Sequence, residues 1–301
     1  MGRAGASRVA AVVALAVAAT GNALAGEVLT DQQAPSPALG RPLTYAVYLP
    51  DEAARGAGPL PVAYLLHGYG GGQREWLQGG RLEALLDRLI EEGAIAPLIA
   101  VMPEAGKSWY VDSAEFGGPG DYQTAIARDL VRHVDATYPT SASRSGRAVA
   151  GLSMGGYGAL NLAFRHPDVF GAVAALSPAI FAPAGASGRN RQLGGTPESL
   201  DRWYPRTFGD NFDPEIYAER SPFAMVAALA DLATPPRILI AVGDDDFFKL
   251  YFGAVEMFVA LKEAGVGLEF RVYDGDHTWD FWRTVAGEMF IFLDRARAPG
   301  G

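Results

Sequence analysis

The 301-residue sequence contains no cysteine, and this absence excludes several kinds of chemistry. Without thiols the chain has no disulfide, no thiol nucleophile and no cysteine-ligated metal. Runs of basic residues are absent as well, and the formal net charge is −9. Because binding to phosphate groups needs clustered lysine and arginine side chains, this acidic balance argues against a nucleic-acid-binding surface. The chain also lacks internal repeats and long low-complexity segments.

The first 25 residues have the composition of a signal peptide. Arg3 and Arg8 precede an apolar run at 9–19, and the sequence Ala23-Leu24-Ala25 matches the small-residue pattern before a cleavage site. The run is shorter than the roughly 20 residues that a membrane span needs, so we predict cleavage after Ala25; an uncleaved anchor is the alternative. Cleavage would leave 23 basic and 34 acidic side chains, a net charge of −11, on a secreted or periplasmic protein.

Short apolar segments alternate with helical patterns over most of the remaining chain. This alternation predicts one α/β domain over residues 44–295, with a doubly wound, mostly parallel sheet and helices on both faces. Residues 26–43 are expected to form a polar lead and 296–301 a short tail. The expected strands lie at 44–49, 61–66, 97–102, 147–152, 170–176, 237–242 and 268–273, and the expected helices at 81–92, 122–138, 157–166, 251–264 and 279–295.

The regular pattern is interrupted between about residues 178 and 222, where glycine, proline and polar residues surround scattered aromatics. We interpret this segment as an insertion on the catalytic side of the sheet. It is either a lid or pocket wall, or a packed surface excursion without contact to a substrate.

Ser153 lies in the sequence Gly151-Leu152-Ser153-Met154-Gly155, between a predicted strand and a predicted helix. The G-x-S-x-G pattern allows a serine to occupy a strained strand-to-helix turn with its hydroxyl above the sheet, because a side chain at either glycine would crowd the turn. This pattern predicts that Ser153 is a nucleophile. A glycine-rich turn with an incidental serine is the alternative.

A serine nucleophile needs a base and a carboxylate that orients the base. Of the four histidines, His277 follows a predicted strand, as Ser153 does, and active sites of open α/β sheets form at that edge. His67 lies in a glycine-rich loop, and His133 and His166 lie in or at the end of predicted helices. We therefore predict that His277 is the base; alternatively it is a surface histidine paired with Asp274 or Asp276.

Three consecutive aspartates, Asp244, Asp245 and Asp246, follow the strand that ends at residue 242, and one of them is expected to orient the histidine. A calcium site is the alternative for these residues, but the surrounding sequence does not match the EF-hand pattern. We predict neither a metal nor a cofactor.

An oxyanion needs preorganised N–H donors. The first is expected from Met154, directly after the nucleophile, and the second from Tyr69 in the loop His67-Gly68-Tyr69-Gly70-Gly71-Gly72. This loop matches neither the dinucleotide-binding nor the lysine-containing phosphate-binding pattern.

These motifs together resemble the putative-esterase branch of α/β-hydrolases, which includes esterase D and S-formylglutathione hydrolase proteins, feruloyl and acetyl-xylan esterases and the antigen 85 mycolyltransferases. The resemblance covers about residues 44–293. Its carriers are the segments at 65–71, 102–104, 108–110, 151–159, 166–170, 243–247 and 277–282. It implies an α/β-hydrolase fold, and the family's G-x-x-D pattern falls on Gly243 and Asp246, which implies that Asp246 is the acid.

The resemblance and the residues together predict a secreted serine esterase that forms an acyl-enzyme at Ser153. Its partner would be a small or polysaccharide-linked ester. Acyl transfer to a sugar or lipid hydroxyl is an alternative reaction, and a noncatalytic wall- or glycan-binding protein is a less favoured alternative function. Large aromatics near the predicted site are expected either to line an acyl pocket or to belong to the core: Trp109, Tyr110, Phe247, Trp279 and Trp282.

Overall fold

The computed structural model describes residues 26–183 and 202–297. Its centre is an eight-stranded sheet with the order β1-β2-β4-β3-β5-β6-β7-β8. The pairs β1–β2 and β2–β4 are antiparallel and all the other pairs are parallel. The strands are β1 Glu27–Ala34, β2 Leu43–Leu49, β3 Val62–Leu66, β4 Ile99–Pro103, β5 Arg147–Leu152, β6 Ala172–Leu176, β7 Arg237–Gly243 and β8 Glu269–Tyr273.

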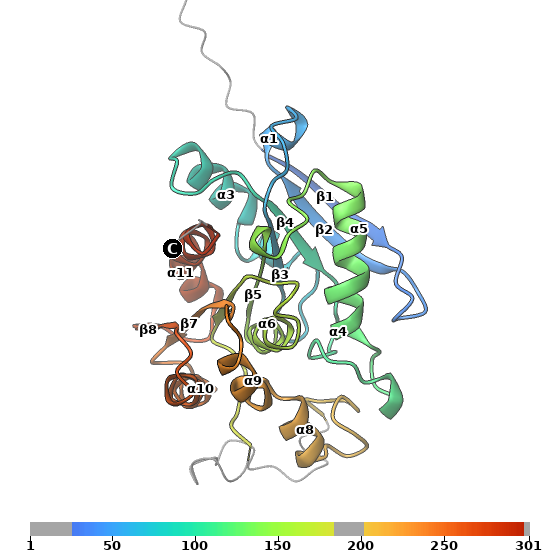
Figure 1. Cartoon of the computed structure of the whole chain (residues 1–301), viewed down its shortest axis with the longest axis vertical. Helices are drawn as coiled ribbons and strands as arrows, with labels where there is room; N and C mark the ends of the chain where they lie inside the picture. Colours follow the sequence, from blue (N-terminus) through green and yellow to red (C-terminus); the bar gives the residue numbers. More distant parts are fainter. Residues whose placement is uncertain (1–25, 184–201, 298–301) are drawn as a thin grey trace, which may run out of the picture.

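Helices cover both faces of this sheet, with α3 and α11 on one side and α5 and α6 on the other (Figure 1). The α-helices are α1 Asp51–Ala54, α2 Glu75–Gln78, α3 Leu82–Glu91, α4 Tyr122–Thr124, α5 Val131–Thr137, α6 Met154–Arg165, α8 Pro214–Arg220, α9 Val226–Ala230, α10 Tyr251–Glu263 and α11 Trp279–Arg295. A π-helical stretch, Ala125–Leu130, joins α4 to α5, and 3₁₀ turns lie at Ala114–Phe116, Arg144–Gly146 and Pro222–Met225.

Apart from the arginines that begin β5 and β7, the central strands β3 to β7 are apolar because both of their faces are buried. In β3, Tyr64 and Leu66 pack into the core beneath α6, whereas Ala63 and Leu65 pack into the core beneath α3 and α11. The alternation of sheet faces along one strand therefore fills two cores at once. The predicted doubly wound, mostly parallel α/β fold is confirmed.

The expected N-terminal lead, residues 26–43, contains a strand that the sequence pattern did not predict. Residues 27–34 form β1, an edge strand that pairs with β2 and has a register irregularity between Leu29 and Gln32. Most residues of this edge strand are exposed or only partly buried, so its sequence is mostly polar and lacks the apolar run of a central strand. The predicted signal peptide at 1–25 lies outside the described residues, as do residues 298–301 of the predicted tail.

The predicted insertion is described at residues 178–183 and 202–222, and residues 184–201 lie outside the description. Its C-terminal part is packed: Tyr204, Phe208, Phe212 and Tyr217 form an aromatic cluster that contacts Tyr157 of α6 through Phe208. Asp213 caps α8 by accepting the N–H of Glu215 at 2.8 Å. Trp203 in the same segment is exposed, and its ring lies 5.3 Å from that of Tyr69. A lid or pocket-wall role for the insertion stays a hypothesis.

A buried carboxylate ties the segment after β1 to the π-helical stretch. Asp129 is 7% exposed, and its Oδ2 accepts hydrogen bonds from the Ser36 hydroxyl at 2.9 Å and from the Ala38 N–H at 3.0 Å. A buried donor that loses its acceptor destabilises the folded state by the free energy of removing that donor from water.

Replacing Asp129 with alanine should therefore lower the free energy of unfolding by about 1–3 kcal/mol. Urea unfolding at neutral pH measures the change, and the exposed Asp168→Ala variant, expected within about 0.5 kcal/mol of the parent, is the matched control. Equal effects of the two substitutions would contradict a structural role for the Asp129 bonds.

Candidate active site

Ser153 lies between the end of β5 and the first residue of α6, with φ of 54° and ψ of −119°. A non-glycine residue in such a conformation costs about 1–3 kcal/mol. The flanking glycines are required: a Cβ on Gly151 would lie 2.2 Å from the Gly155 carbonyl oxygen, and a Cβ on Gly155 would lie 2.3 Å from the Leu66 carbonyl oxygen. The expected strained turn between a strand and a helix is therefore present.

Hydrogen bonds from the neighbouring strand hold this turn. The Ser153 N–H donates to the Leu176 carbonyl at the end of β6 at 2.9 Å, and the Ser153 carbonyl accepts the N–H of Ala179 at the same distance. Because its backbone groups are occupied by β6 and the residues after it, Ser153 presents only its hydroxyl above the sheet edge.

His277 meets that hydroxyl from the loop between β8 and α11. Its Nε2 lies 3.0 Å from Ser153 Oγ, and its Nδ1 lies 2.8 Å from Asp246 Oδ2. An ionised carboxylate can only accept a hydrogen bond, so Nδ1 of His277 carries a proton and donates a hydrogen bond to Asp246. The Nε2 lone pair then faces the serine hydroxyl, which donates to it.

Asp246 has a side chain with no exposed surface. Its second oxygen, Oδ1, accepts the N–H of Phe248 at 2.8 Å. A buried carboxylate needs such partners, and here a backbone donor and an imidazole supply them. Its neighbours Asp244 and Asp245 are exposed. The structure therefore brings one of the three aspartates to His277, and it is the one that the family pattern implies.

The sequence offered Asp276 as an alternative partner of the His277 imidazole, but its carboxylate binds backbone N–H groups instead. Its Oδ1 accepts the N–H of His277 at 2.6 Å and the N–H of Phe247 at 3.1 Å. One carboxylate thus connects the loop after β7 to the loop after β8. Sequence reasoning missed this role, since nothing in the local pattern indicates which backbone lies across the gap.

The other three histidines have different partners. The buried His67 accepts the Ala105 N–H at Nε2, 3.0 Å away, and donates from Nδ1 to the Gly68 carbonyl at 2.8 Å. Burial lowers the pKa of His67. Desolvation also lowers the pKa values of His133, which contacts the Tyr45 hydroxyl, and His166, which contacts Gln123. We assign no role as a base to any of them.

The loop at residues 67–72, called the glycine loop here, borders the Ser153 turn. A Cβ on Gly68 would lie 3.7 Å from Ser153 Cβ. The N–H of Gly68 donates to Glu75 Oε2 at 2.7 Å, and the N–H of Gly71 donates to the Gly68 carbonyl at 3.1 Å. Within residues 26–183 and 202–297, the N–H groups of Tyr69 and Met154 have no hydrogen-bond acceptor. These are the two donors named from the sequence.

Aromatic rings surround the imidazole. The Trp282 ring lies 4.9 Å from the His277 ring, edge to face, and its Nε1–H donates to Ser177 Oγ at 3.2 Å. Phe248 lies 5.0 Å from the same ring and Phe247 lies 6.0 Å from it, and both residues are exposed, Phe247 the more so. Phe247 was expected here from the sequence, but Phe248, which is nearer, was missed because the family motif ends at residue 247.

Three of the five expected pocket aromatics are buried core residues: Trp109, Tyr110 and Trp282. Tyr110 has no exposed surface, and its hydroxyl donates to the His67 carbonyl at 2.8 Å, so a pocket-lining role for it is wrong. Trp109 is 4% exposed, and its Nε1–H donates to the Trp203 carbonyl at 2.8 Å. Trp279 is partly exposed and packs edge to face against Trp76, 5.4 Å away. Trp282 is buried and packs against His277.

Asp244, Asp245 and Asp274 form an exposed acidic group whose oxygens lie within 4.8 Å of one another. Exposed carboxylates commonly group in this way without a metal. Calcium takes about six to eight oxygen ligands, more than these three side chains supply, so we assign no calcium site.

The family model described as putative esterase matches residues 36–293. The chain belongs to the putative esterase family. It is 28% identical to an acetyl esterase of Caldicellulosiruptor saccharolyticus over 78% of this chain and 84% of that protein. It is 31% identical to an endo-1,4-beta-xylanase/feruloyl esterase of Xylanibacter ruminicola over 49% of this chain, which corresponds to 21% of that larger protein.

A solved ferulic acid esterase has a similar structure, with a TM-score of 0.72, 27% identity, and coverage of 91% of this chain and 99% of that chain. The resemblance stated from the motifs and the α/β-hydrolase fold are therefore confirmed. This member of the putative esterase family is an enzyme, a carboxylic ester hydrolase. No helix within residues 26–183 and 202–297 combines the length and the apolar composition that crossing a membrane requires.

The contact between Asp246 and His277 yields a first prediction for the activity. Asp246→Asn keeps the size of the side chain but offers an N–H to an imidazole nitrogen that must donate, which favours the wrong tautomer. We expect kcat for p-nitrophenyl acetate to fall about 10³–10⁴-fold. Asp245→Asn, one residue away and exposed, is the matched control and should retain the parental rate. An equally active Asp246→Asn variant would remove Asp246 from the mechanism.

Proposed function

We propose that the protein is an exported serine esterase that cleaves carboxylic esters through an acyl-Ser153 intermediate. The observation that carries the proposal is the continuous hydrogen-bonded series from Ser153 Oγ through His277 to the buried carboxylate of Asp246, with distances of 3.0 Å and 2.8 Å. A hydroxyl in this arrangement can lose its proton as it attacks, which a serine in water does not do at neutral pH.

In the proposed reaction Ser153 Oγ attacks the ester carbonyl carbon while His277 Nε2 takes the hydroxyl proton. The carbonyl π electrons move to oxygen, and the N–H groups of Tyr69 and Met154 stabilise the resulting oxyanion. When the tetrahedral intermediate collapses, the bond to the leaving alkoxide breaks and His277 gives it the proton. The alcohol departs and the acyl group remains on Ser153.

Water then enters, and His277 removes one of its protons as it attacks the acyl-enzyme. Collapse of the second intermediate releases the carboxylic acid and returns the proton to Ser153. Asp246 keeps the proton on Nδ1 throughout and stabilises the imidazolium that forms twice in each cycle. We propose water as the acceptor, and not a sugar or lipid hydroxyl, because the three relatives described above all have esterase in their names.

For the substrate we propose a small or polysaccharide-linked ester with an acyl group that contacts the exposed rings of Phe247 and Phe248 beside His277. The names of the relatives, which include acetyl and feruloyl esterases, support this class. Turnover of a panel of acetyl, longer acyl and feruloyl esters ranks the acyl groups, and a rate that is independent of the acyl group would contradict the contact.

The role of Ser153 has a direct test. Ser153→Ala removes the nucleophile, so hydrolysis of p-nitrophenyl acetate should fall by at least about 10⁴-fold while the circular dichroism spectrum is unchanged. A fluorophosphonate probe, which forms a bond only to an activated serine, should label the parent and not the variant. Hydrolysis retained by Ser153→Ala would overturn the proposed mechanism.

We also propose that export removes residues 1–25. Gly26 is buried, and its N–H donates to Asp87 Oδ1 at 3.0 Å. Cleavage after Ala25 would convert this N–H into an ammonium group beside the Asp87 carboxylate, where an ion pair stabilises it.

N-terminal sequencing of the protein recovered from the periplasm or medium should therefore begin at Gly26. Recovery of the unprocessed chain, or a first residue inside β1, would contradict the proposed cleavage.

A further inference from the structure

The edge strand β1 contacts the segment that follows the glycine loop through Asp31. This residue has φ of 58° and lies within the register irregularity between Leu29 and Gln32, so the strand bulges there. A bulge turns a side chain and a backbone N–H away from the ladder. Both of these groups of Asp31 are used in contacts outside the sheet.

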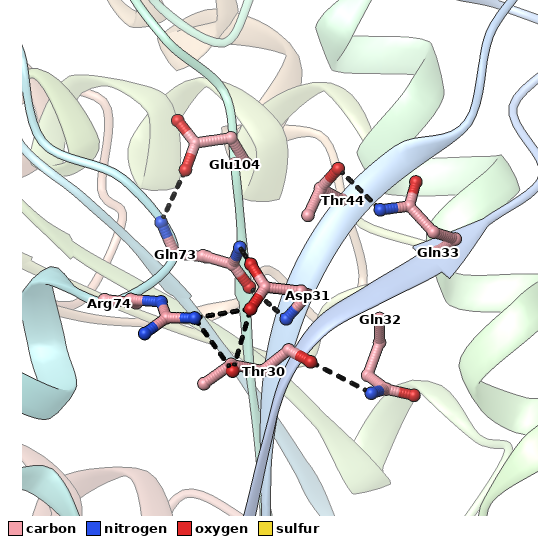
Figure 2. Close-up of polar contacts among 8 residues, drawn as sticks. All are labelled: Thr30, Asp31, Gln32, Gln33, Thr44, Gln73, Arg74 and Glu104. Atoms are coloured by element: carbon pink, nitrogen blue, oxygen red, sulfur yellow. Dashed lines mark hydrogen bonds and ion pairs between the residues drawn. The ribbon is translucent and has the colours of Figure 1, made fainter.

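Asp31 and Gln73 form two reciprocal hydrogen bonds (Figure 2). The Asp31 N–H donates to Gln73 Oε1 at 2.9 Å, and Gln73 Nε2 donates to Asp31 Oδ1 at 2.7 Å. The Gln73 residue is 7% exposed. Arg74 binds the other oxygen of Asp31 and donates to Thr30 Oγ1 at 3.1 Å. The hydrogen bonds from Thr30 and Arg74 hold the pKa of Asp31 below its ordinary value, which keeps it ionised.

Two further carboxylates hold the backbone on either side of the glycine loop. Glu75 accepts the N–H of Gly68 at 2.7 Å. Glu104 accepts the N–H of Gln73 at 2.9 Å, as Figure 2 shows. The glycines make this approach possible, because a Cβ on Gly71 would lie 2.2 Å from Glu75 Oε2 and a Cβ on Gly72 would lie 2.4 Å from Glu104 Oε2. The loop is thus fixed at its start by Glu75 and at its end by Gln73.

We propose that the Asp31–Gln73 pair is a positioning device for the proposed oxyanion donor Tyr69. The pair holds the end of the glycine loop on β1, and Glu75 and Glu104 hold its backbone, so that the Tyr69 N–H stays aimed at the space above Ser153. Gln73 and Asp31 touch neither Ser153 nor His277 and are not catalytic residues. This inference rests on the proposed function, since it assigns a purpose to the oxyanion donor of that mechanism.

A displaced N–H donor weakens the stabilisation of the transition state more than the binding of the ground state, because the negative charge develops only in the transition state. Errors of about 1 Å in such a position can cost about 10²-fold in rate. Disturbing the pair should therefore lower kcat while KM is retained, and it should also weaken binding of an inhibitor that forms an oxyanion at Ser153.

The test reverses the polarity of the pair. Gln73→Glu replaces the donor Nε2 by a carboxylate oxygen that faces Asp31, so two like charges meet where a hydrogen bond was. Asp31→Asn/Gln73→Glu restores the bond in the opposite direction, because the side-chain amide introduced at position 31 can donate to the new carboxylate while the backbone N–H there still has an acceptor. Asp31→Asn alone keeps an acceptor for the Gln73 side chain, and it completes the double-mutant cycle.

With p-nitrophenyl acetate we expect Gln73→Glu to lower kcat about tenfold with KM within about twofold of the parent. Its affinity for an aryl trifluoromethyl ketone, which adds to Ser153 and forms an oxyanion, should fall by a similar factor. The double variant should recover kcat to within about threefold. Gln33→Glu is the matched control: Gln33 lies on the same strand, and its side chain donates to Thr44 Oγ1 at 2.9 Å, away from the loop (Figure 2).

A parental kcat for Gln73→Glu would overturn the inference. So would a lowered kcat that the double variant does not recover, or one that accompanies a lower melting temperature without weaker ketone binding, because these results indicate a general structural role. The Ser153→Ala variant separates the two proposals. If Ser153→Ala is inactive and Gln73→Glu is fully active, only the positioning role fails, whereas hydrolysis by Ser153→Ala removes the mechanism on which it rests.

Discussion

The close approach of two backbone segments, at Gly155 and Leu66, is the constraint on which the site depends. Glycine at 155 allows the first turn of α6 to pass where a Cβ would lie 2.3 Å from the Leu66 carbonyl oxygen. The end of β3 therefore lies directly against the start of α6. Since the glycine loop continues β3 and Ser153 precedes α6, the same contact brings the start of the glycine loop beside Ser153, where a Cβ on Gly68 would lie 3.7 Å from Ser153 Cβ. Any larger residue at 155 separates the nucleophile from the loop.

Carboxylates organise the loops around this contact. Asp246, Asp276, Glu75 and Glu104 each accept at least one backbone N–H from a loop at the carboxyl edge of the sheet. Hydrogen bonds to an ionised acceptor are about twice as strong as neutral ones and are directional. The chain has no cysteine, so these bonds hold the loops without disulfides. The excess of acidic residues thus has a structural use in this protein.

Local patterns in the sequence were sufficient for strands β2 to β8, for the turn at Ser153 and for the position of His277 after a strand, because each depends on residues close together in the chain. The choice among three aspartates needed the family pattern, since the side chain that turns inward is decided by the Phe248 N–H and by His277, 31 residues further on. Strand β1 escaped prediction because an edge strand lacks the apolar run of a central one. The sequence left open whether Tyr110 lines a pocket or belongs to the core, because it does not indicate that the Tyr110 hydroxyl binds the His67 carbonyl.

Strand β1, which the sequence analysis did not predict, is also the strand that the proposed positioning role requires. The bulge at Asp31 accounts for both. A bulge uses backbone groups outside the ladder, so the residues around Asp31 are polar and do not follow the alternation of a regular strand. Thr30 and Asp31 instead contact the Gln73-Arg74 segment beyond the glycine loop. β1 begins at Glu27, two residues after the proposed cleavage site. On these proposals, cleavage after Ala25 leaves a chain whose first strand, β1, supports the loop that carries the oxyanion donor Tyr69. The position of the Tyr69 N–H then depends on the correct pairing of β1 close to the new N-terminus.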